Sequence, residues 1–195
     1  MVPALALNNT QSLTGAIGLA PRSVTQLDGH PNQTMNCAPA TMALIERYLG
    51  PELALSDRAL VATLVRVAGT DRTGTGPDGI VRMVHGLGLN GAVLGDWRHL
   101  VQHLGSVQHV VRDRGWLALA AGNGFALPWN QRPGMVGGHA IALVGLDPAG
   151  NFVVQDPGDT APLLRTLTPL ELTRFIGGIR GVNQNGGGGL YFVWR

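Results

Sequence analysis

The sequence predicts an α+β domain, in which a helical N-terminal half packs on an antiparallel sheet formed by the C-terminal half. Three observations carry this prediction. Between Cys37 and Arg112 the chain contains segments that begin and end with helix-capping residues. After Trp116 it changes to short apolar runs bounded by glycine and proline, which is typical of strands. Two of these runs are joined by a four-residue turn sequence, which indicates antiparallel pairing.

The first helix is expected to begin at Cys37 and to stop before Gly50. Asn36 can cap its start, and Pro39 is tolerated in the first turn because its missing N–H would be unpaired there. Gly50 suits a left-handed helix end. Cys37 is therefore predicted to lie at a helix N-terminus.

Three more helices are expected in the N-terminal half. Their predicted bounds are a Ser56 cap to about Val67, Pro77 to about Leu87, and about Asp96 to Arg112. The runs WLALAAG, HAIALVGL and NFVVQ are the predicted strands, and the turn at 147–150 joins the last two. A capping box at 168–171 then opens a final helix, and LYFVW supplies a closing strand.

Length and charge limit the classes of function. A chain of 195 residues suits one domain, so a single domain is expected over 1–195, with an irregular segment over 1–23. The net charge is +2 and the arginines are scattered, which argues against a nucleic-acid partner. No apolar run approaches the roughly 20 residues of a membrane span. The oligomeric state is left open.

Cys37 is the single cysteine, so it cannot form an internal disulfide and any chemical role must be that of a thiol. A thiolate is the nucleophilic form, and a helix N-terminus stabilises it through unpaired N–H groups and the helix dipole. The alternative is a small buried thiol that only packs in a core. Position alone does not choose between these two interpretations.

His139 and Asp156 are the predicted partners of this thiol. His139 stands at the start of one strand and Asp156 at the end of the next, so a hairpin brings both to the same end of the sheet. His139 would then accept the thiol proton and later protonate a leaving amine. The Asp156 carboxylate would accept the Nδ1 proton of His139 and so determine which ring nitrogen faces the sulfur.

The segments NCAPATMALIERYLG, GTGPDGIVRMVHGLGLNG and GGHAIALVGLDPAGNFVVQDP resemble the double-glycine peptidase-like group of papain-fold cysteine peptidases, which includes bacteriocin-leader peptidases. The similarity covers about residues 24–175. It implies a papain-like fold with Cys37 as nucleophile, His139 as base and Asp156 as orienting residue. Ala38 departs from the family, whose members commonly have glycine there, and this puts close substrate packing in doubt.

The resemblance also implies a glutamine upstream of the cysteine, whose side-chain amide stabilises the oxyanion together with the cysteine backbone N–H. Gln26 lies eleven residues before Cys37 and Gln33 lies four before it. The setting of Gln26 in VTQLD is closer to the family segment, so Gln26 is modestly favoured. Both remain candidates.

The expected function is a thiol-dependent hydrolase that cleaves a peptide or other amide bond through a Cys-His-Asp triad and an acyl-enzyme. The expected partner is a peptide or protein substrate, with no cofactor and no metal. The alternatives are a glutamine deamidase or acyltransferase effector or toxin on the same fold, or an inactive peptide-binding module. Asp96, His99 and His103 share a helix face, but the zinc-protease motif is incomplete and an exposed face is favoured. Without a general signal sequence, the expected location is the cytoplasm, or export by a specialised secretion system.

Overall fold

The computed structural model describes most of the chain. The described residues are 18–27, 29, 33–50, 53–94, 97–130, 137–177 and 188–195, with the backbone alone for 97–99 and 101. The expected irregular segment over 1–23 therefore lies outside this description except for its last six residues. Those residues, 18–23, contain no helix or strand.

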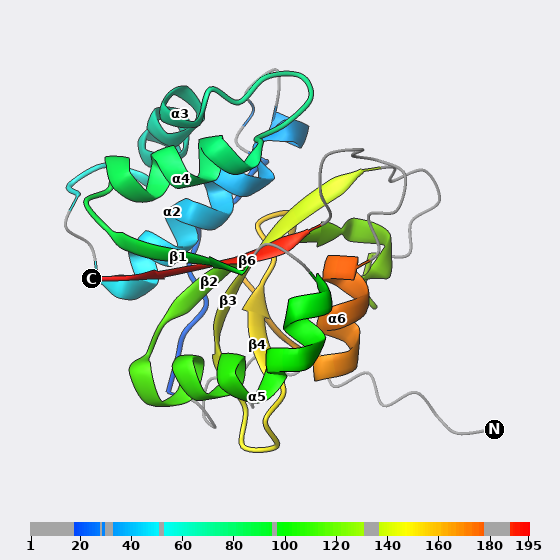
Figure 1. Cartoon of the computed structure of the whole chain (residues 1–195). Coiled ribbons are helices and arrows are strands. Elements are labelled where there is room, and N and C mark those ends of the chain that lie inside the picture. The colour runs from blue at the N-terminus through cyan, green and yellow to red at the C-terminus, as the bar shows by residue number, and fades with distance from the viewer. Residues whose placement is uncertain are drawn as a thin grey trace.

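A six-stranded antiparallel sheet forms the centre of the fold, with the order β1-β6-β2-β3-β4-β5 (Figure 1). The strands are β1 (Asn90–Leu94), β2 (Leu117–Asn123), β3 (Gly138–Leu146), β4 (Phe152–Gln155), β5 (Leu164–Leu167) and β6 (Gly189–Trp194). The predicted hairpin is confirmed, since β3 pairs with β4 across a turn in which the Asp147 side chain accepts the backbone N–H of Asn151 at 2.8 Å. β3 and β4 thus share the sheet end that carries His139 and Asp156.

Helices cover both faces of this sheet (Figure 1). The helices are α2 (Cys37–Leu49), α3 (Asp57–Ala68), α4 (Pro77–Gly86), α5 (Trp97–Arg114), α6 (Pro169–Gly177) and the 3₁₀ turns η1 (Gln33–Met35) and η2 (Gly124–Ala126). α2 lies directly on β2 and β3, while α3 and α4 pack beside it. α5 and α6 pack together on the opposite face. None of the described helices is long and apolar enough to cross a bilayer.

Alternation along the strands produces two hydrophobic cores. Leu117 and Leu119 of β2 join the core under α2, α3 and α4, whereas Ala118 and Ala120 join the core under α5 and α6. Successive side chains of a strand point to opposite faces, so strands covered on both sides are apolar at nearly every position. This explains why the predicted strands appear as continuous apolar runs.

The predicted helices and the capping box are confirmed. α2 spans the expected residues, the Ser56 side chain caps α3, and Thr168 and Glu171 bond reciprocally at the start of α6. Strands β1 and β5 were not predicted. Both are short, both lie at sheet edges, and most of β1 is exposed, so neither has the apolar pattern of a buried strand.

The expected side-chain cap by Asn36 is wrong. Its side chain makes no capping bond, and its φ of −89° and ψ of 14° differ from the extended conformation that an N-cap usually has. The physical reason is the turn η1, which runs directly into α2. The Asn36 backbone N–H closes that turn by donating to Gln33 O at 3.2 Å, so the backbone is already coiled before the helix starts.

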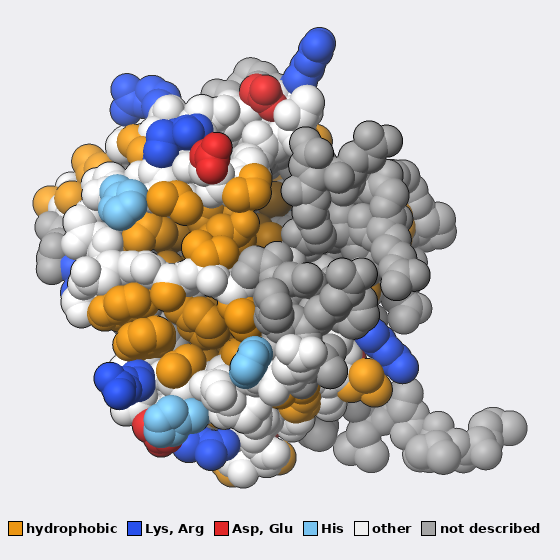
Figure 2. Space-filling view, in the orientation of Figure 1, with side chains coloured by type: hydrophobic (Ala, Val, Ile, Leu, Met, Phe, Trp, Pro, Cys, Tyr) orange, Lys and Arg blue, Asp and Glu red, His pale blue; other side chains and the backbone are white. Residues whose placement is uncertain are grey.

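Apolar side chains gather in two areas of the face shown in Figure 2. Among the described residues, the exposed large hydrophobic side chains include Val81 of α4 and Val93 of β1. Arginine side chains on the same face are separated from one another by other residue types (Figure 2). The described arginine side chains on this face thus form no single cluster.

Candidate active site

Cys37 is the first residue of α2 and its side chain is partly exposed. No acidic residue occupies the first turn of this 13-residue helix. The positive end of the helix dipole is therefore not offset there, and it favours a negative charge on the sulfur. Cys37 therefore combines access from solvent with a position at the positive end of a helix.

A buried hydrogen bond fixes the position of α2 along β3. Thr41, one turn after Cys37, donates from its hydroxyl to Ala140 O at 3.0 Å, and Ala140 directly follows His139. Residues four apart lie on the same face of a helix, so the contact that holds Thr41 on β3 also turns Cys37 toward this strand. The Cys37 side chain is hydrogen-bonded to His139 as a result.

His139 and Asp156 meet at the shared end of β3 and β4, as the hairpin predicts. His139 Nε2 lies 2.7 Å from Asp156 Oδ1, and both residues are buried. The expected ring nitrogen is wrong, however, because Asp156 bonds Nε2 and not Nδ1. Nδ1 is thereby left for the Cys37 sulfur. The strand order determines that the two residues meet, whereas the side-chain rotamer of His139 determines which nitrogen points to the carboxylate.

Three donors hold the Asp156 carboxylate. Besides His139, the backbone N–H of Gly158 donates to Oδ1 at 2.8 Å, and Trp129 Nε1–H donates to Oδ2 at 2.9 Å. A Cβ at position 158 would lie 3.1 Å from Asp156 Oδ1 and 3.6 Å from the His139 ring, so glycine allows this close approach. Both carboxylate oxygens accept hydrogen bonds, and these bonds hold the Asp156 side chain in one orientation.

The pKa values of the pair are displaced in opposite directions. Burial lowers the pKa of His139, but hydrogen bonds and charges from Asp156 and Cys37 outweigh it and raise that pKa from 6.5 to about 10. Burial raises the pKa of Asp156, but the bonds from His139, Trp129 and Gly158 outweigh it and hold that pKa below 3.8. The folded state therefore favours an imidazolium paired with a carboxylate.

This displacement predicts a pH dependence of folding. A raised histidine pKa contributes stability that is complete below 6.5 and is lost as pH rises toward about 10, and a lowered aspartate pKa contributes stability that is lost as pH falls below 3.8. The pair therefore stabilises the fold most between pH 3.8 and 6.5. Urea unfolding of the wild type and of His139→Gln at several pH values measures this. The difference between the two midpoints should shrink toward alkaline pH, and a constant difference would contradict the assignment.

Sequence reasoning missed the residues that support Asp156. Trp129 is one of them, since its indole N–H is a direct partner of the carboxylate. The Arg165 guanidinium lies 4.9 Å from the centre of the Trp129 ring, and it forms a two-point ion pair with Asp159. The only sequence feature that could have indicated this role was the position of Trp129 in the loop before His139. No sequence feature indicated a role for Arg165 or Asp159.

The two glutamine candidates have different surroundings. Gln26 is 8% exposed, and its Oε1 has no hydrogen-bond partner among the described residues. Its backbone N–H donates to Pro157 O, next to Asp156, at 2.9 Å. Gln33 Oε1 instead accepts the backbone N–H of Gly29 at 2.9 Å, a contact within its own loop. Gln26 is thus linked to the strand end that carries Asp156, and Gln33 is used locally.

The metal alternative is only partly covered by the structure. Asp96 lies outside the described residues, the side chain of His99 is not described, and the backbone at His103 is non-helical, with φ −120° and ψ 18°. This kink in α5 interrupts the single helix face on which the three residues were grouped. Among the side chains that are described, no cluster of three or more metal-binding types occurs.

Solved structures that are similar to this arrangement of helices and strands include peptidase domains. The peptidase domain of Streptococcus ComA, a bi-functional ABC transporter of a quorum-sensing pathway, is 18% identical, with a TM-score of 0.53 over 90% of this chain and 98% of that chain. A double glycine motif protease from an AMS/PCAT transporter, in complex with the leader peptide, is 14% identical, with a TM-score of 0.53 over 90% and 93%. A Bacillus anthracis protein designated a C39-like peptidase is 13% identical, with a TM-score of 0.52 over 89% and 94%.

No protein-family model matches the chain, and no curated protein matches its sequence. The likeness to the solved structures nevertheless extends over almost the whole chain. The chain has the α+β, papain-like fold of C39 double-glycine peptidase domains, as the sequence predicts. At such low identity the likeness defines the fold, and the chemistry has to be argued from the side chains of the site.

Proposed function

We propose that this chain is a thiol-dependent peptidase in which Cys37 is the nucleophile, His139 the acid and base, and Asp156 the orienting residue. One observation carries the proposal. A partly exposed cysteine at a helix N-terminus is hydrogen-bonded to a buried histidine, and a carboxylate with three donors holds that histidine from the other side. These are the contacts that an activated thiol needs.

The reaction begins with the Cys37 thiolate and the His139 imidazolium as an ion pair. The sulfur forms a bond to the substrate carbonyl carbon, and the carbonyl π electrons move to the oxygen. The C–N bond then breaks as the oxyanion collapses, and His139 gives its proton to the leaving amine. A thioester between Cys37 and the acyl part of the substrate remains.

Water completes the cycle. His139 removes a proton from the water, whose oxygen bonds to the thioester carbon, and collapse of this second oxyanion breaks the C–S bond. The acid is released, and the thiolate and imidazolium are restored. Asp156 keeps Nδ1 directed at the sulfur throughout, because it binds Nε2. The Cys37 backbone N–H and the Gln26 side chain are the proposed donors to both oxyanions.

A peptide is the substrate that the comparisons favour. One of the solved proteins with this fold is a double glycine motif protease in complex with the leader peptide. The same reaction on a glutamine side chain would release ammonia, and transfer to an amine would make a new amide, so the triad alone does not select peptide hydrolysis.

Incubation of the purified chain with a cell extract separates these reactions. The wild type is expected to generate new peptide N-termini that Cys37→Ala, the matched control, does not generate. Mass spectrometry of labelled termini and of glutamine side chains in the same sample measures both products. Deamidated glutamines without new termini would show that the chain is a deamidase and not a peptidase. No difference between the wild type and Cys37→Ala would contradict the assignment of an enzymatic activity.

A further inference from the structure

The segment 22–26 forms no helix or strand, yet it is held against the strand end that carries Asp156. Gln155 Oε1 accepts the backbone N–H of Arg22 at 3.0 Å, and Gln155 Nε2 donates to Arg22 O at 2.5 Å. The amide of one side chain thus bonds both backbone groups of Arg22, as a neighbouring strand would. Pro157 O accepts two more bonds from this segment, from the Thr25 hydroxyl at 3.0 Å and from the Gln26 N–H at 2.9 Å.

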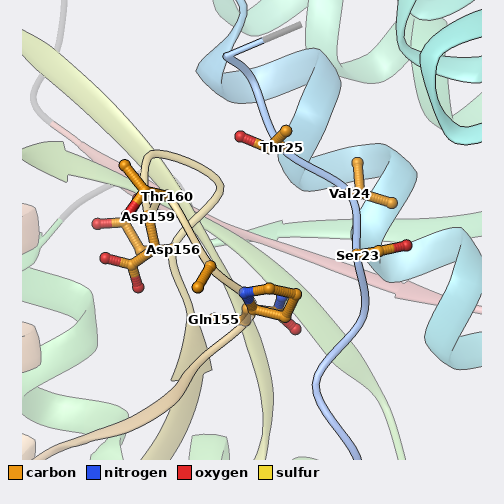
Figure 3. A pocket seen from close by; sticks show the side chains of 9 residues that line it. Ser23, Val24, Thr25, Gln155, Asp156, Asp159 and Thr160 are labelled. Carbon is orange, nitrogen blue, oxygen red and sulfur yellow. The ribbon is translucent and has the colours of Figure 1, made fainter.

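Figure 3 shows this segment beside the end of β4, with a small pocket between Thr25 on one side and Asp156, Asp159 and Thr160 on the other. The segment forms one wall of the pocket, and the residues that follow β4 form the other. Their relative position is therefore determined by the contacts that bridge them. The Gln155 amide is the bridge nearest to the strand.

Gln155 is a polar residue at a core position. It is 1% exposed, and Val153, two residues earlier on the same face of β4, belongs to the hydrophobic core under α2. A buried amide without partners costs about 1–3 kcal/mol, so packing alone would favour an apolar residue here. The hydrogen bonds to Arg22 offset that cost and explain why an amide occupies the position.

A third element meets Gln155 through Tyr48. The Tyr48 hydroxyl, on the same helix as Cys37, donates to Gln155 Oε1 at 2.5 Å, and the Arg22 guanidinium lies 5.2 Å from the centre of the Tyr48 ring. Burial raises the pKa of Tyr48 to about 12, although Arg22 lowers it in part, so the hydroxyl keeps its proton and remains a donor. The Gln155 amide therefore links the Cys37 helix, the Asp156 strand and the segment 22–26.

We propose that Gln155 is a positioning residue that holds the segment 22–26 in place, so that the Gln26 side chain serves as an oxyanion donor. This inference rests on the proposed function, in which Gln26 has that role. Gln155 itself does not touch the reacting atoms. Its effect is confined to steps that form an oxyanion, because its contacts position the segment and leave the bonds of His139 unchanged.

Two reagents separate the steps without requiring the natural substrate. p-Nitrophenyl acetate acetylates a thiol through a tetrahedral oxyanion, whereas iodoacetamide alkylates it by direct displacement, which forms no oxyanion. Both rates are measured on the full chain, which has one cysteine. The variants are Gln155→Met, which has a similar length and no amide, Gln26→Ala, and the double variant. Gln108→Met is the matched control, because Gln108 also donates to a backbone carbonyl, Gly150 O at 2.9 Å, on the other face.

Gln155→Met is expected to lower the acetylation rate about tenfold to a hundredfold, the effect of a small misplacement of a catalytic group. Its alkylation rate should equal that of the wild type. The double variant should be no slower than the slower single variant, because both changes remove the same donor. Gln108→Met should leave both rates unchanged.

Equal slowing of both reagents by Gln155→Met would overturn the proposal, because Gln155 would then act through His139 and Asp156. The proposal would also be overturned if the rate reductions of the two single variants multiplied in the double variant. An acetylation rate of Gln155→Met equal to that of the wild type would overturn it as well. If Gln155→Met does not fold, Tyr48→Phe is used in its place, because it removes one hydrogen bond to the same amide. Tyr48→Phe should slow acetylation and leave alkylation unchanged. Failure of the proposed function appears separately, as wild-type alkylation no faster than that of a free thiol.

Discussion

His139→Gln is expected to slow alkylation of Cys37 by iodoacetamide about a thousandfold at mildly acidic pH. A free thiol has a pKa near 8.5, so about one molecule in a thousand is thiolate at about pH 5.5. In the proposed mechanism the His139 imidazole, which is hydrogen-bonded to Cys37, takes the thiol proton, so the wild type should react as a thiolate. Glutamine fills the space of the ring and cannot accept a proton, so the sulfur returns to the behaviour of a free thiol.

His109→Gln is the matched control, because His109 also faces an aspartate, Asp113, at 2.5 Å, but on the exposed surface of α5. Its alkylation rate should equal that of the wild type. The single cysteine ensures that the mass increase reports one site. A wild-type rate equal to that of N-acetylcysteine at the same pH would mean that the ion pair is absent, and it would favour the inactive peptide-binding module.

Asp156→Ala is expected to have the second large effect, on both activity and stability. The substitution removes the acceptor of three donors, from His139, Gly158 and Trp129, in a buried site. Removing one partner of a buried ion pair costs about 3–5 kcal/mol of unfolding free energy. Loss of the orienting carboxylate should slow peptide cleavage about a thousandfold, because the imidazole is no longer held with Nδ1 toward the sulfur. Urea unfolding and the rate of product formation measure the two effects.

Asp156→Asn tests the same site more finely. Its single amide oxygen can accept from His139 and Gly158, but its NH₂ group then faces the Trp129 N–H, so two donors oppose each other. Adding Trp129→Phe removes the opposing donor and should raise the rate of Asp156→Asn about tenfold, whereas Trp129→Phe alone lowers the wild-type rate. Trp116→Phe is the control, since Trp116 stacks on Trp194 away from Asp156. Absence of any rescue would show that the indole does not act on the carboxylate.

The sequence was sufficient where the determinants are local. Helix signals around Cys37 predicted its place at the start of α2, and the turn at 147–150 predicted the hairpin. His139 and Asp156 are only 17 residues apart, and the pairing of two consecutive strands brings them together. Each of these features depends on hydrogen bonds between neighbours in the sequence, so the residue pattern is enough to predict it.

The sequence did not predict the edges of the sheet or the start of α2 in detail. β1 pairs with β6 across about a hundred residues of chain, and its exposed side chains show no apolar alternation. The coiled backbone at Asn36 is set by η1, a three-residue turn without a distinct signal. Long-range pairing and short turns depend on the packed structure, and this is why the residue pattern did not reveal them.

The sequence alone determined which three residues could form a thiol site and which elements carry them. The tertiary structure decided how their atoms are directed. Nε2 of His139 points to Asp156, and the Trp129 indole bonds the second carboxylate oxygen. α2 is held on β3 by a hydrogen bond between residues that are 99 positions apart in the sequence. It also decided that Gln155 bonds Arg22, 133 residues away. These contacts arise only when the N-terminal segment and α2 pack on the finished sheet, because rotamers and long-range hydrogen bonds are selected by close packing.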